Sequence, residues 1–342
     1  MKVNRLSAAK RIPKAAKTAG KQESYPGCLL VGDWRWLGSH TGNPDSLATI
    51  APASGQPGWR LQRGNWMRVR WISAAVGIPL FVSVCIWGAL PFAIGMFIVA
   101  FLGLCEMVRT YHSQGIHPNL LLAATGLLAP ALCITPSQPV HALFELGAVG
   151  AVLVAIAAEV FTAAKTGEMK VAQNTAFGLL CALYTALFAG LPALRETPGI
   201  TQGVAFPNLD KGLALVLVTA FCVWGTDTFA LFVGRVAGRR KLAPLLSPSK
   251  TVEGALGGVA GGLLFGAVFG QWLLGNAGYG LAIGAVAGFI GQIGDLFESA
   301  LKREAGVKDF GILVPGHGGV LDRFDSVLVV APIVCLGVWL RW

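Results

Sequence analysis

Long apolar runs follow one another from Trp71 to the end of this chain, and they set the strongest limit on its fold. A helix needs about 20 mostly apolar residues to cross the hydrocarbon core of a bilayer. Hydrophobic residues make up 54% of the chain and charged residues only 13%, whereas a soluble domain has about 25% charged residues. We therefore predict an all-α polytopic membrane protein.

We expect about nine transmembrane helices, each with ends defined to within a few residues. The ranges are 71–88, 90–108, 119–136, 142–163, 175–193, 213–234, 253–274, 278–299 and 325–341. Almost nothing separates the first two ranges, which predicts a tight helical hairpin. Prolines lie in the third range and just before the fourth. Either segment is therefore a candidate for a re-entrant segment that does not cross the membrane.

Lys and Arg in the short connections predict the orientation, because basic loops stay on the cytoplasmic side. They precede the first span and follow the second, fourth, sixth and eighth, whereas the other connections are poor in them. This alternation places the N-terminus in the cytoplasm and the C-terminus outside, and it fits an odd number of spans. We expect a multi-pass protein of the inner (cytoplasmic) membrane, with its strongly charged loops on the cytoplasmic side.

Residues 1–66 differ in composition from everything that follows. They begin with a basic, polar segment, continue as a Gly-, Pro- and Ser-rich stretch, and lack the apolar core of a secretory signal. This composition predicts a disordered basic extension. An upstream start assigned in error is an alternative, because Met67 resembles the natural start of a membrane protein. The membrane domain is then expected to be residues 67–342.

The net charge of +10 is mainly a property of this extension, which holds ten Lys and Arg residues and three acids. Such a tail favours contact with solvent or lipid headgroups, and we expect no nucleic-acid partner. The seven cysteines form no CxxC pair, and six of them lie in apolar runs. They indicate small core residues and not disulfides or a zinc site.

Acidic side chains inside the apolar runs are the first candidates for a functional site. Asp227 lies in the sixth predicted span, and Asp295 and Glu298 lie in the eighth. An ionisable group within a span is expensive, so it marks a functional site by default. On a helix Asp295, Glu298 and Lys302 fall on one face. Asp322 opens the ninth span. Ion pairs that only hold helices together are the alternative.

Two charged connections follow the sixth and eighth spans. The first, Gly234–Gly254, has the sequence GRVAGRRKLAPLLSPSKTVEG, in which Ser247, Ser249 and Lys250 surround Pro248. Hydroxyls, a lysine and the N–H groups of a turn before a helix predict a phosphate-binding cradle. A basic topology signal with a Ser-Pro turn is the alternative.

The second connection, Ser299–Ser326, crowds charge and glycine between two apolar runs, as SALKREAGVKDFGILVPGHGGVLDRFDS. Carboxylates from several helix ends beside basic residues suggest a Mg²⁺–phosphate site, because Mg²⁺ prefers oxygen ligands and often bridges carboxylates to substrate phosphates. The glycines permit a loop that folds over a triphosphate. The loop is not a P-loop, because it contains no GxxxxGK[ST] pattern.

At these residues the chain resembles a known family. The pattern S-x-x-K-R-x4-K-D-x-G-x3-P-G-H-G-G-x-x-D-R-x-D, which starts at Ser299, is similar to the signature of the phosphatidate cytidylyltransferases, or CDP-diacylglycerol synthases. The core S-P-x-K-T-x-E-G at Ser247–Gly254 also resembles that family, whereas Phe229-Ala230 stands where Gly-Ala is common. The resemblance covers roughly Met67–Trp342.

The resemblance implies an enzyme that joins CTP and phosphatidate at the cytoplasmic surface, giving CDP-diacylglycerol and pyrophosphate, with Mg²⁺ as cofactor. Together with the chemistry above, it implies Asp295 and Asp322 as metal ligands. The residues that it implies for catalysis on the phosphates are Lys302, Arg303, Lys308, Asp309, His317 and Arg323. Of these, His317 either donates to a phosphate or only shapes the loop. The residues implied to bind substrate are Ser247, Ser249, Lys250 and Asp227.

Three other interpretations stay open. A related enzyme would share the motif chemistry but transfer the cytidylyl group to another lipid phosphate. Specificity for the acceptor lipid would then lie in apolar residues of the spans. A secondary transporter would also carry intramembrane acids, but we find neither a clear repeat nor a midplane cluster. A non-enzymatic lipid-binding scaffold would need no metal-like acid pair. A homodimer is also open, because the small-residue run Gly254–Gly270 permits close helix packing within one chain or between two.

Overall fold

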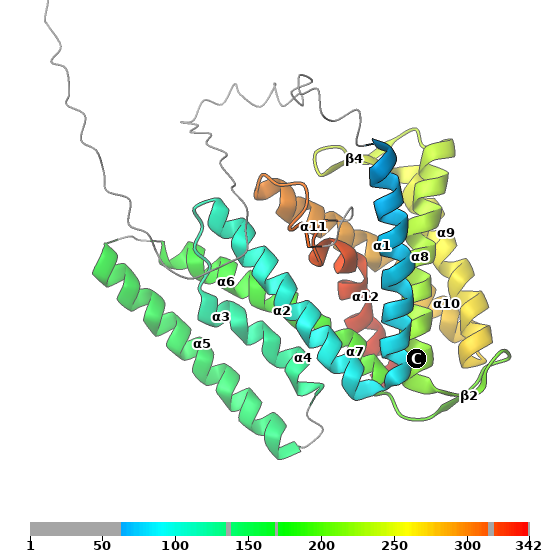
Figure 1. Ribbon diagram of the computed structural model, residues 1–342, viewed down its shortest axis with the longest axis horizontal. Helices are drawn as coiled ribbons and strands as arrows, with labels where there is room; N and C mark the ends of the chain where they lie inside the picture. Colours follow the sequence, from blue (N-terminus) through cyan, green and yellow to red (C-terminus); the bar gives the residue numbers. More distant parts are fainter. Residues whose placement is uncertain (1–62, 135–137, 168–169, 314–317, 341–342) are drawn as a thin grey trace, which may run out of the picture. The chain divides into compact units, whose positions relative to one another are not determined.

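The computed structural model describes residues 63–134, 138–167, 170–313 and 318–340. Helices account for most of these residues (Figure 1). His317 and residues 1–62 of the predicted extension lie outside the described residues. Helix α1 begins at Arg63, so the predicted domain boundary at Met67 falls within the first turns of a helix.

The first half of the described chain is a series of helices without strands. A tight connection at Gly88 joins the first two, and its φ of 143° is one that side-chain-bearing residues rarely adopt. This is the hairpin that the sequence predicts. The elements are α1 (Arg63–Trp87), α2 (Ala89–Ser113), α3 (Leu120–Ala124), η2 (Thr125–Leu127), α4 (Leu128–Leu132), α5 (Gln138–Thr166), α6 (Val171–Ala186), η3 (Leu187–Ala189) and α7 (Gly190–Arg195).

The second half adds two short hairpins to the helices. Its elements are β1 (Ile200–Gln202), β2 (Pro207–Asp210), α8 (Lys211–Ala237), β3 (Lys241–Ala243), β4 (Ser247–Thr251), α9 (Val252–Phe269), η4 (Gly270–Leu274), α10 (Ala277–Val286), η5 (Ala287–Gly291), α11 (Gln292–Glu304) and α12 (Leu321–Trp339). The segments η4 and η5 are π-helical turns that continue the helices beside them.

Each of the nine predicted ranges overlaps one helix or an unbroken run of helical elements. Within the described residues, five segments are long and apolar enough to cross a membrane: Ala89–Ser113, Val171–Arg195, Lys211–Ala237, Val252–Leu274 and Ala277–Glu304. Two further apolar stretches, Ala75–Trp87 and Leu120–Leu132, are shorter than a full span. The protein is therefore a helical membrane protein with five candidate spans, and the count of nine stays a prediction.

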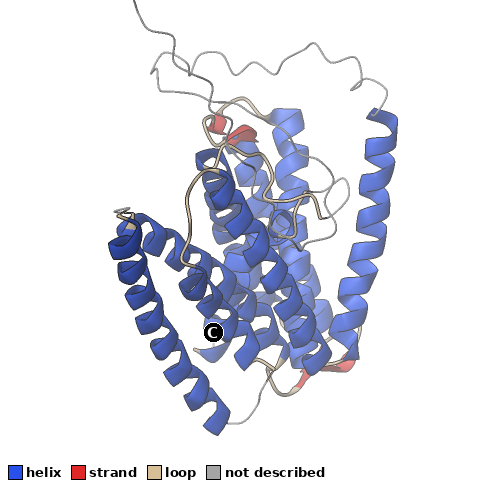
Figure 2. Cartoon of the chain, turned by 60° about the vertical axis from the view of Figure 1, so that its left-hand side comes forward, coloured by secondary structure: helices blue, strands red, loops and turns tan. Residues whose placement is uncertain are grey.

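Two antiparallel hairpins depart from the all-α prediction. One pairs β1 with β2 and the other pairs β3 with β4, and they lie at opposite ends of α8 (Figure 2). The Ser-Pro turn, which the sequence offers as part of the alternative to a phosphate cradle, does not form at Pro248: this residue lies in β4, and the turn is formed by residues 244–246. The reason is local: a proline lacks an N–H donor but is tolerated in a strand at a sheet edge.

Glycines bring the backbones of α9 and α10 into direct contact. A Cβ added to Gly266 would lie 2.2 Å from the carbonyl oxygen of Gly280, and one on Gly284 would lie 2.2 Å from that of Gly262. Small residues permit such close approach between helices in a membrane. The sequence left open whether these glycines pack within one chain or between two chains. At these positions the packing lies within one chain.

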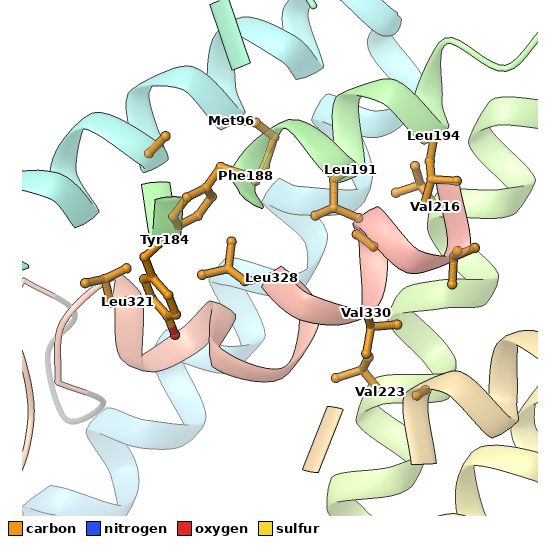
Figure 3. Close-up of a cluster of buried hydrophobic side chains, with 14 of the residues drawn as sticks. Met96, Tyr184, Phe188, Leu191, Leu194, Val216, Val223, Leu321, Leu328 and Val330 are labelled. Carbon is orange, nitrogen blue, oxygen red and sulfur yellow. The ribbon is translucent and has the colours of Figure 1, made fainter. Parts of the chain in front are cut away.

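A buried apolar cluster fixes helix α12 among its neighbours (Figure 3). The members labelled in Figure 3 come from α2, α6, η3, α7, α8 and α12, and they are Met96, Tyr184, Phe188, Leu191, Leu194, Val216, Val223, Leu321, Leu328 and Val330. Leu321 packs so closely on α2 that a Cβ on Gly103 would lie 2.9 Å from it. The first turn of α12, which carries Asp322, therefore packs against α2.

Candidate active site

The two charged connections meet beside the C-terminal end of α11. Arg303 is exposed, and its Nε donates to the carbonyl oxygen of Leu246 in the β3–β4 turn at 3.2 Å. Another nitrogen of the same guanidinium donates to the carbonyl oxygen of Val307, also at 3.2 Å. One arginine thus joins the first basic connection to the start of the Gly-rich one, as expected for two loops that share a site.

Two cavities adjoin each other at Asp227 and Asp295, which line both. The first has a volume of about 460 Å³ and is mostly apolar, so we call it the apolar cavity. Its apolar wall includes Ile78 and Phe81 of α1 and Trp224 of α8. Its charged end is formed by Asp227, Asp295, Asp322, Arg323 and Asp325.

The second cavity has a volume of about 510 Å³ and lies between α8, α9, α11 and the β3–β4 hairpin. We call it the basic cavity, because Arg235 and Lys250 line it. Ser249 lines it too, whereas Ser247 does not. The segment that leads into the hairpin is held to α9 by Glu253, whose carboxylate accepts from the backbone N–H of Arg239 at 2.9 Å. A predicted phosphate cradle therefore faces a cavity that reaches the intramembrane acids.

Lys250 and Asp295 form an ion pair between β4 and α11. Their side chains are 27% and 28% exposed, so both remain accessible from the cavities. The pair joins a residue predicted to bind substrate to a residue predicted to bind metal. An ion pair as open as this contributes little to stability, because water competes for both partners.

Asp322 lies in a different environment, at the centre of a buried polar network. Lys302 donates to it at 2.8 Å and to Glu298 at 3.1 Å, and Tyr184 donates to Glu298 at 2.8 Å. Glu298 is fully buried. The other oxygen of Asp322 accepts from the backbone N–H groups of Phe310 and Gly319, at 3.0 and 2.8 Å. These bonds hold the two ends of the Gly-rich loop against α12.

The chain folds back between Asp295 and Asp322, because both line the same cavity although they are 27 positions apart. Lys302 is buried with its ammonium group between two carboxylates. Lys308 and Asp309 are exposed on the loop, and Arg323 is exposed at the apolar cavity. His317 lies outside the described residues.

The sequence assigns no role to Asp325 or Arg235, and for Glu106, an acid within an apolar run, it favours structural pairing. Asp325 and Arg235 line the cavities, and Glu106 accepts hydrogen bonds from the start of α12. Their signals were present: Asp325 belongs to the quoted pattern, and Glu106 is an acid inside an apolar run. The sequence does not show that Glu106 lies beside residues more than two hundred positions away.

The donor set suits Mg²⁺, which prefers oxygen ligands and is usually held by one or two carboxylates, with waters and phosphate oxygens completing its shell. Asp295 and Asp322 supply such a pair at one cavity. In the described part of the chain, no group of three or more His, Cys, Asp or Glu residues has the spacing of a metal centre. A carboxylate offers about four lone-pair positions, and Asp322 uses three of them, so Asp295 is the stronger candidate.

These features define a helical membrane protein in which a basic and an apolar cavity share intramembrane acids. Comparison with known proteins identifies the class more closely. The profile of the cytidylyltransferase family matches residues 68–340, and the chain belongs to this family.

Curated relatives match most of the chain. A phosphatidate cytidylyltransferase of Synechocystis sp. is 33% identical over 283 residues, which covers 78% of this chain and 94% of the relative. The enzyme of the same name from Bacillus subtilis is 33% identical over 277 residues, covering 78% and 96%. That of Staphylococcus saprophyticus is 31% identical over 276 residues, covering 78% and 97%.

Proposed function

We propose that this protein transfers a cytidylyl group from CTP to phosphatidate, forming CDP-diacylglycerol and pyrophosphate in phospholipid biosynthesis. Membership of the cytidylyltransferase family and the names of the relatives support this reaction. The observation that carries the proposal is the junction of the two cavities at Asp227 and Asp295. A nucleotide that comes from water and a lipid that comes from the bilayer need two adjoining compartments of opposite character.

The cavities divide the substrates by their chemistry. The basic cavity offers Ser249, Lys250 and Arg235 to the phosphates of CTP. The apolar cavity offers Ile78, Phe81 and Trp224 to the apolar part of phosphatidate and Arg323 to its phosphate. The reacting phosphates then meet beside Asp295.

The reaction needs charge control more than a strong base. A phosphatidate oxygen, already anionic at neutral pH, attacks the α-phosphorus of CTP. The bond from that phosphorus to the oxygen of the β-phosphate breaks, and pyrophosphate leaves with the electron pair. Cationic side chains that face developing charge at a preorganised site lower such a barrier. Arg303, Lys308 and Arg323 are exposed, and we assign them to this role together with Lys250.

Asp295 and Asp322 are the residues that would hold Mg²⁺, which supplies neutralisation of phosphate charge when it is bound. Lys302 orients Asp322 through their 2.8 Å hydrogen bond. Glu298 and Tyr184 in turn fix the lysine. Asp227, Asp309, Ser247 and His317 remain assigned to the site by family resemblance.

We also propose the membrane arrangement given by the basic connections: nine spans, a cytoplasmic N-terminus, an external C-terminus and an active site on the cytoplasmic face of the inner membrane. The five candidate spans and the further apolar helices support a multi-pass chain. The site lies at the α8 end that carries the basic β3–β4 hairpin, as this orientation requires. A homodimer is part of the proposal and is tested by the mass of the detergent-solubilised particle.

Purified protein tests the reaction directly. With CTP and phosphatidate it should release pyrophosphate and form CDP-diacylglycerol in equal amounts. Diacylglycerol, which lacks the attacking phosphate, is the matched control and should give neither product. Preference for another lipid phosphate would reassign the acceptor. Absence of pyrophosphate release with every lipid phosphate would contradict the proposed function.

A further inference from the structure

Glu106 is a buried acid of α2 that does not line either cavity. One of its carboxylate oxygens accepts from the backbone N–H of Val320 at 2.9 Å, and the other accepts from that of Leu321 at 3.1 Å. These N–H groups open helix α12, where no partner within the helix is available to them. An acid at a helix N-terminus also interacts favourably with the helix dipole.

The Gly-rich loop is packed around this carboxylate. A Cβ on Gly319 would lie 2.5 Å from one oxygen of Glu106, and a Cβ on Gly311 would lie 2.3 Å from the other. Thr110, one helical turn after Glu106, donates to the carbonyl oxygen of Phe310 at 3.1 Å. Helix α2 therefore contacts the loop on both sides of residues 312–318, which explains why glycine stands at both close approaches.

Glu106 and Asp322 divide three successive backbone donors between them. The N–H of Gly319 donates to Asp322 at 2.8 Å, and those of Val320 and Leu321 donate to Glu106. Asp322 and Arg323 follow immediately in the chain and line the apolar cavity. Any shift of the first turn of α12 would move both side chains together.

We infer that Glu106 is a positioning residue, which holds the end of the Gly-rich loop and the start of α12 so that Asp322 and Arg323 face the reacting phosphates. Glu106 acts through backbone N–H groups and touches no substrate. The inference rests on the proposed function for its effect on turnover. Its effect on the loop does not depend on the reaction.

The test compares Glu106→Gln with Glu159→Gln. The glutamine at position 106 keeps the size of the side chain but replaces one acceptor oxygen with a donor that faces an N–H group. Glu159 is a matched control, because it is a partly buried acid on α5 that accepts from Asn174 at 2.7 Å and from Asn119 at 3.2 Å, away from the loop. The measurements are hydrogen exchange of a peptide covering residues 318–325, kcat, the KM for CTP and the melting temperature.

We expect Glu106→Gln to speed exchange in that peptide and to lower kcat by about tenfold or more, as the loss of hydrogen bonds to a charged group implies. The KM for CTP should stay within about twofold, because Ser249, Lys250 and Arg235 keep their places. Glu106→Asp, which keeps the charge but shortens the reach, should fall between the wild type and Glu106→Gln. Glu159→Gln should leave exchange and kcat unchanged.

Unchanged exchange at residues 318–325 in Glu106→Gln would overturn the inference. Equal losses of kcat in the Glu106→Gln and Glu159→Gln variants would do the same, because that result describes general destabilisation. If the wild-type protein formed no CDP-diacylglycerol, the proposed function would fail. The exchange comparison would still decide whether Glu106 holds the loop.

Discussion

At the scale of single residues, two lysine–aspartate pairs of the same chemistry have different surroundings. Lys250 and Asp295 are both partly exposed, whereas Lys302 and Asp322 are buried together with Glu298. Exposed pairs exchange partners easily, but breaking a buried pair leaves a charge without compensation. Lys250 is therefore suited to release Asp295 and bind a phosphate, and Lys302 is suited to fix Asp322.

The two lysines should respond differently to replacement by methionine. Lys250→Met should raise the KM for CTP or lower kcat by roughly 30-fold or more, as expected when a charge-assisted contact of about 2–5 kcal/mol is lost. Its melting temperature should change little. Lys302→Met should destabilise the fold by about 3–5 kcal/mol. Kinetics and thermal melting in detergent separate the two, and a Lys302→Met variant of normal stability would contradict the buried network.

Arg303 gives a further check on the meeting of the two connections. Arg303→Met removes the hydrogen bonds to Leu246 and Val307 together with the exposed charge. We expect turnover to fall and the β3–β4 hairpin to exchange its backbone hydrogens faster. If turnover, KM and exchange all stayed normal, the charge of Arg303 would be only a topology signal.

The sequence shows which charged residues lie within or beside the apolar runs, but it does not show their distant partners. The spacing placed Glu298 and Lys302 on one helix face as part of a candidate site, with an ion pair as the alternative, and the structure forms that ion pair at 3.1 Å. The bond from Lys302 to Asp322 spans a loop, and that from Val320 to Glu106 joins residues 214 positions apart. No local pattern encodes such contacts, because they depend on how whole helices pack.

At the scale of elements, helices were predictable and hairpins were not. Long apolar runs gave the ranges of α8 and α9 to within a few residues. Strands β3 and β4 have three and five residues, too few to show an alternation of apolar and polar side chains. Broken helices such as α3, η2 and α4 are also invisible to hydropathy, which reads them as one apolar run.

The contact between α9 and α10 predicts a sharp difference between two glycine substitutions. Gly266→Ala would place a Cβ 2.2 Å from the carbonyl oxygen of Gly280, so we expect overpacking that destabilises the protein by about 1–3 kcal/mol. Gly150→Ala is the matched control, since nothing lies within 4 Å of its added Cβ and alanine favours a helix. Melting temperatures in one detergent give the comparison. Equal stability of the two variants would rule out the close backbone approach.

At the scale of the whole molecule, the described helices form two compartments whose shared wall is acidic. The family match spans residues 68–340 and leaves the predicted extension outside it. Within the described residues, five segments satisfy the length and composition of a span, whereas the sequence predicts nine spans. Tags added to the connections between helices measure the number of spans and the orientation, because each tag is accessible from only one side of the membrane.

Removal of the extension should leave the reaction intact, because the family match begins after it. We expect a chain without residues 1–62, which keeps α1 whole, to retain activity within a few-fold. A chain without residues 1–66 also loses the first turn of α1, and its activity should not exceed that of the chain without residues 1–62. A membrane-inserted, folded chain without residues 1–62 and without activity would show that the extension contributes to catalysis.

We propose that Asp295, one of the two carboxylates shared by the two cavities, serves the transfer of the cytidylyl group. The most direct measurement is the Mg²⁺ dependence of CDP-diacylglycerol formation by Asp295→Asn. Asp210→Asn is the control, because it changes an aspartate at the opposite end of α8 and asparagine also caps a helix. We predict that Asp295→Asn stays folded, loses nearly all turnover and is not rescued by added Mg²⁺, while Asp210→Asn keeps its turnover. Near-normal turnover of Asp295→Asn with an unchanged Mg²⁺ requirement would contradict the claim.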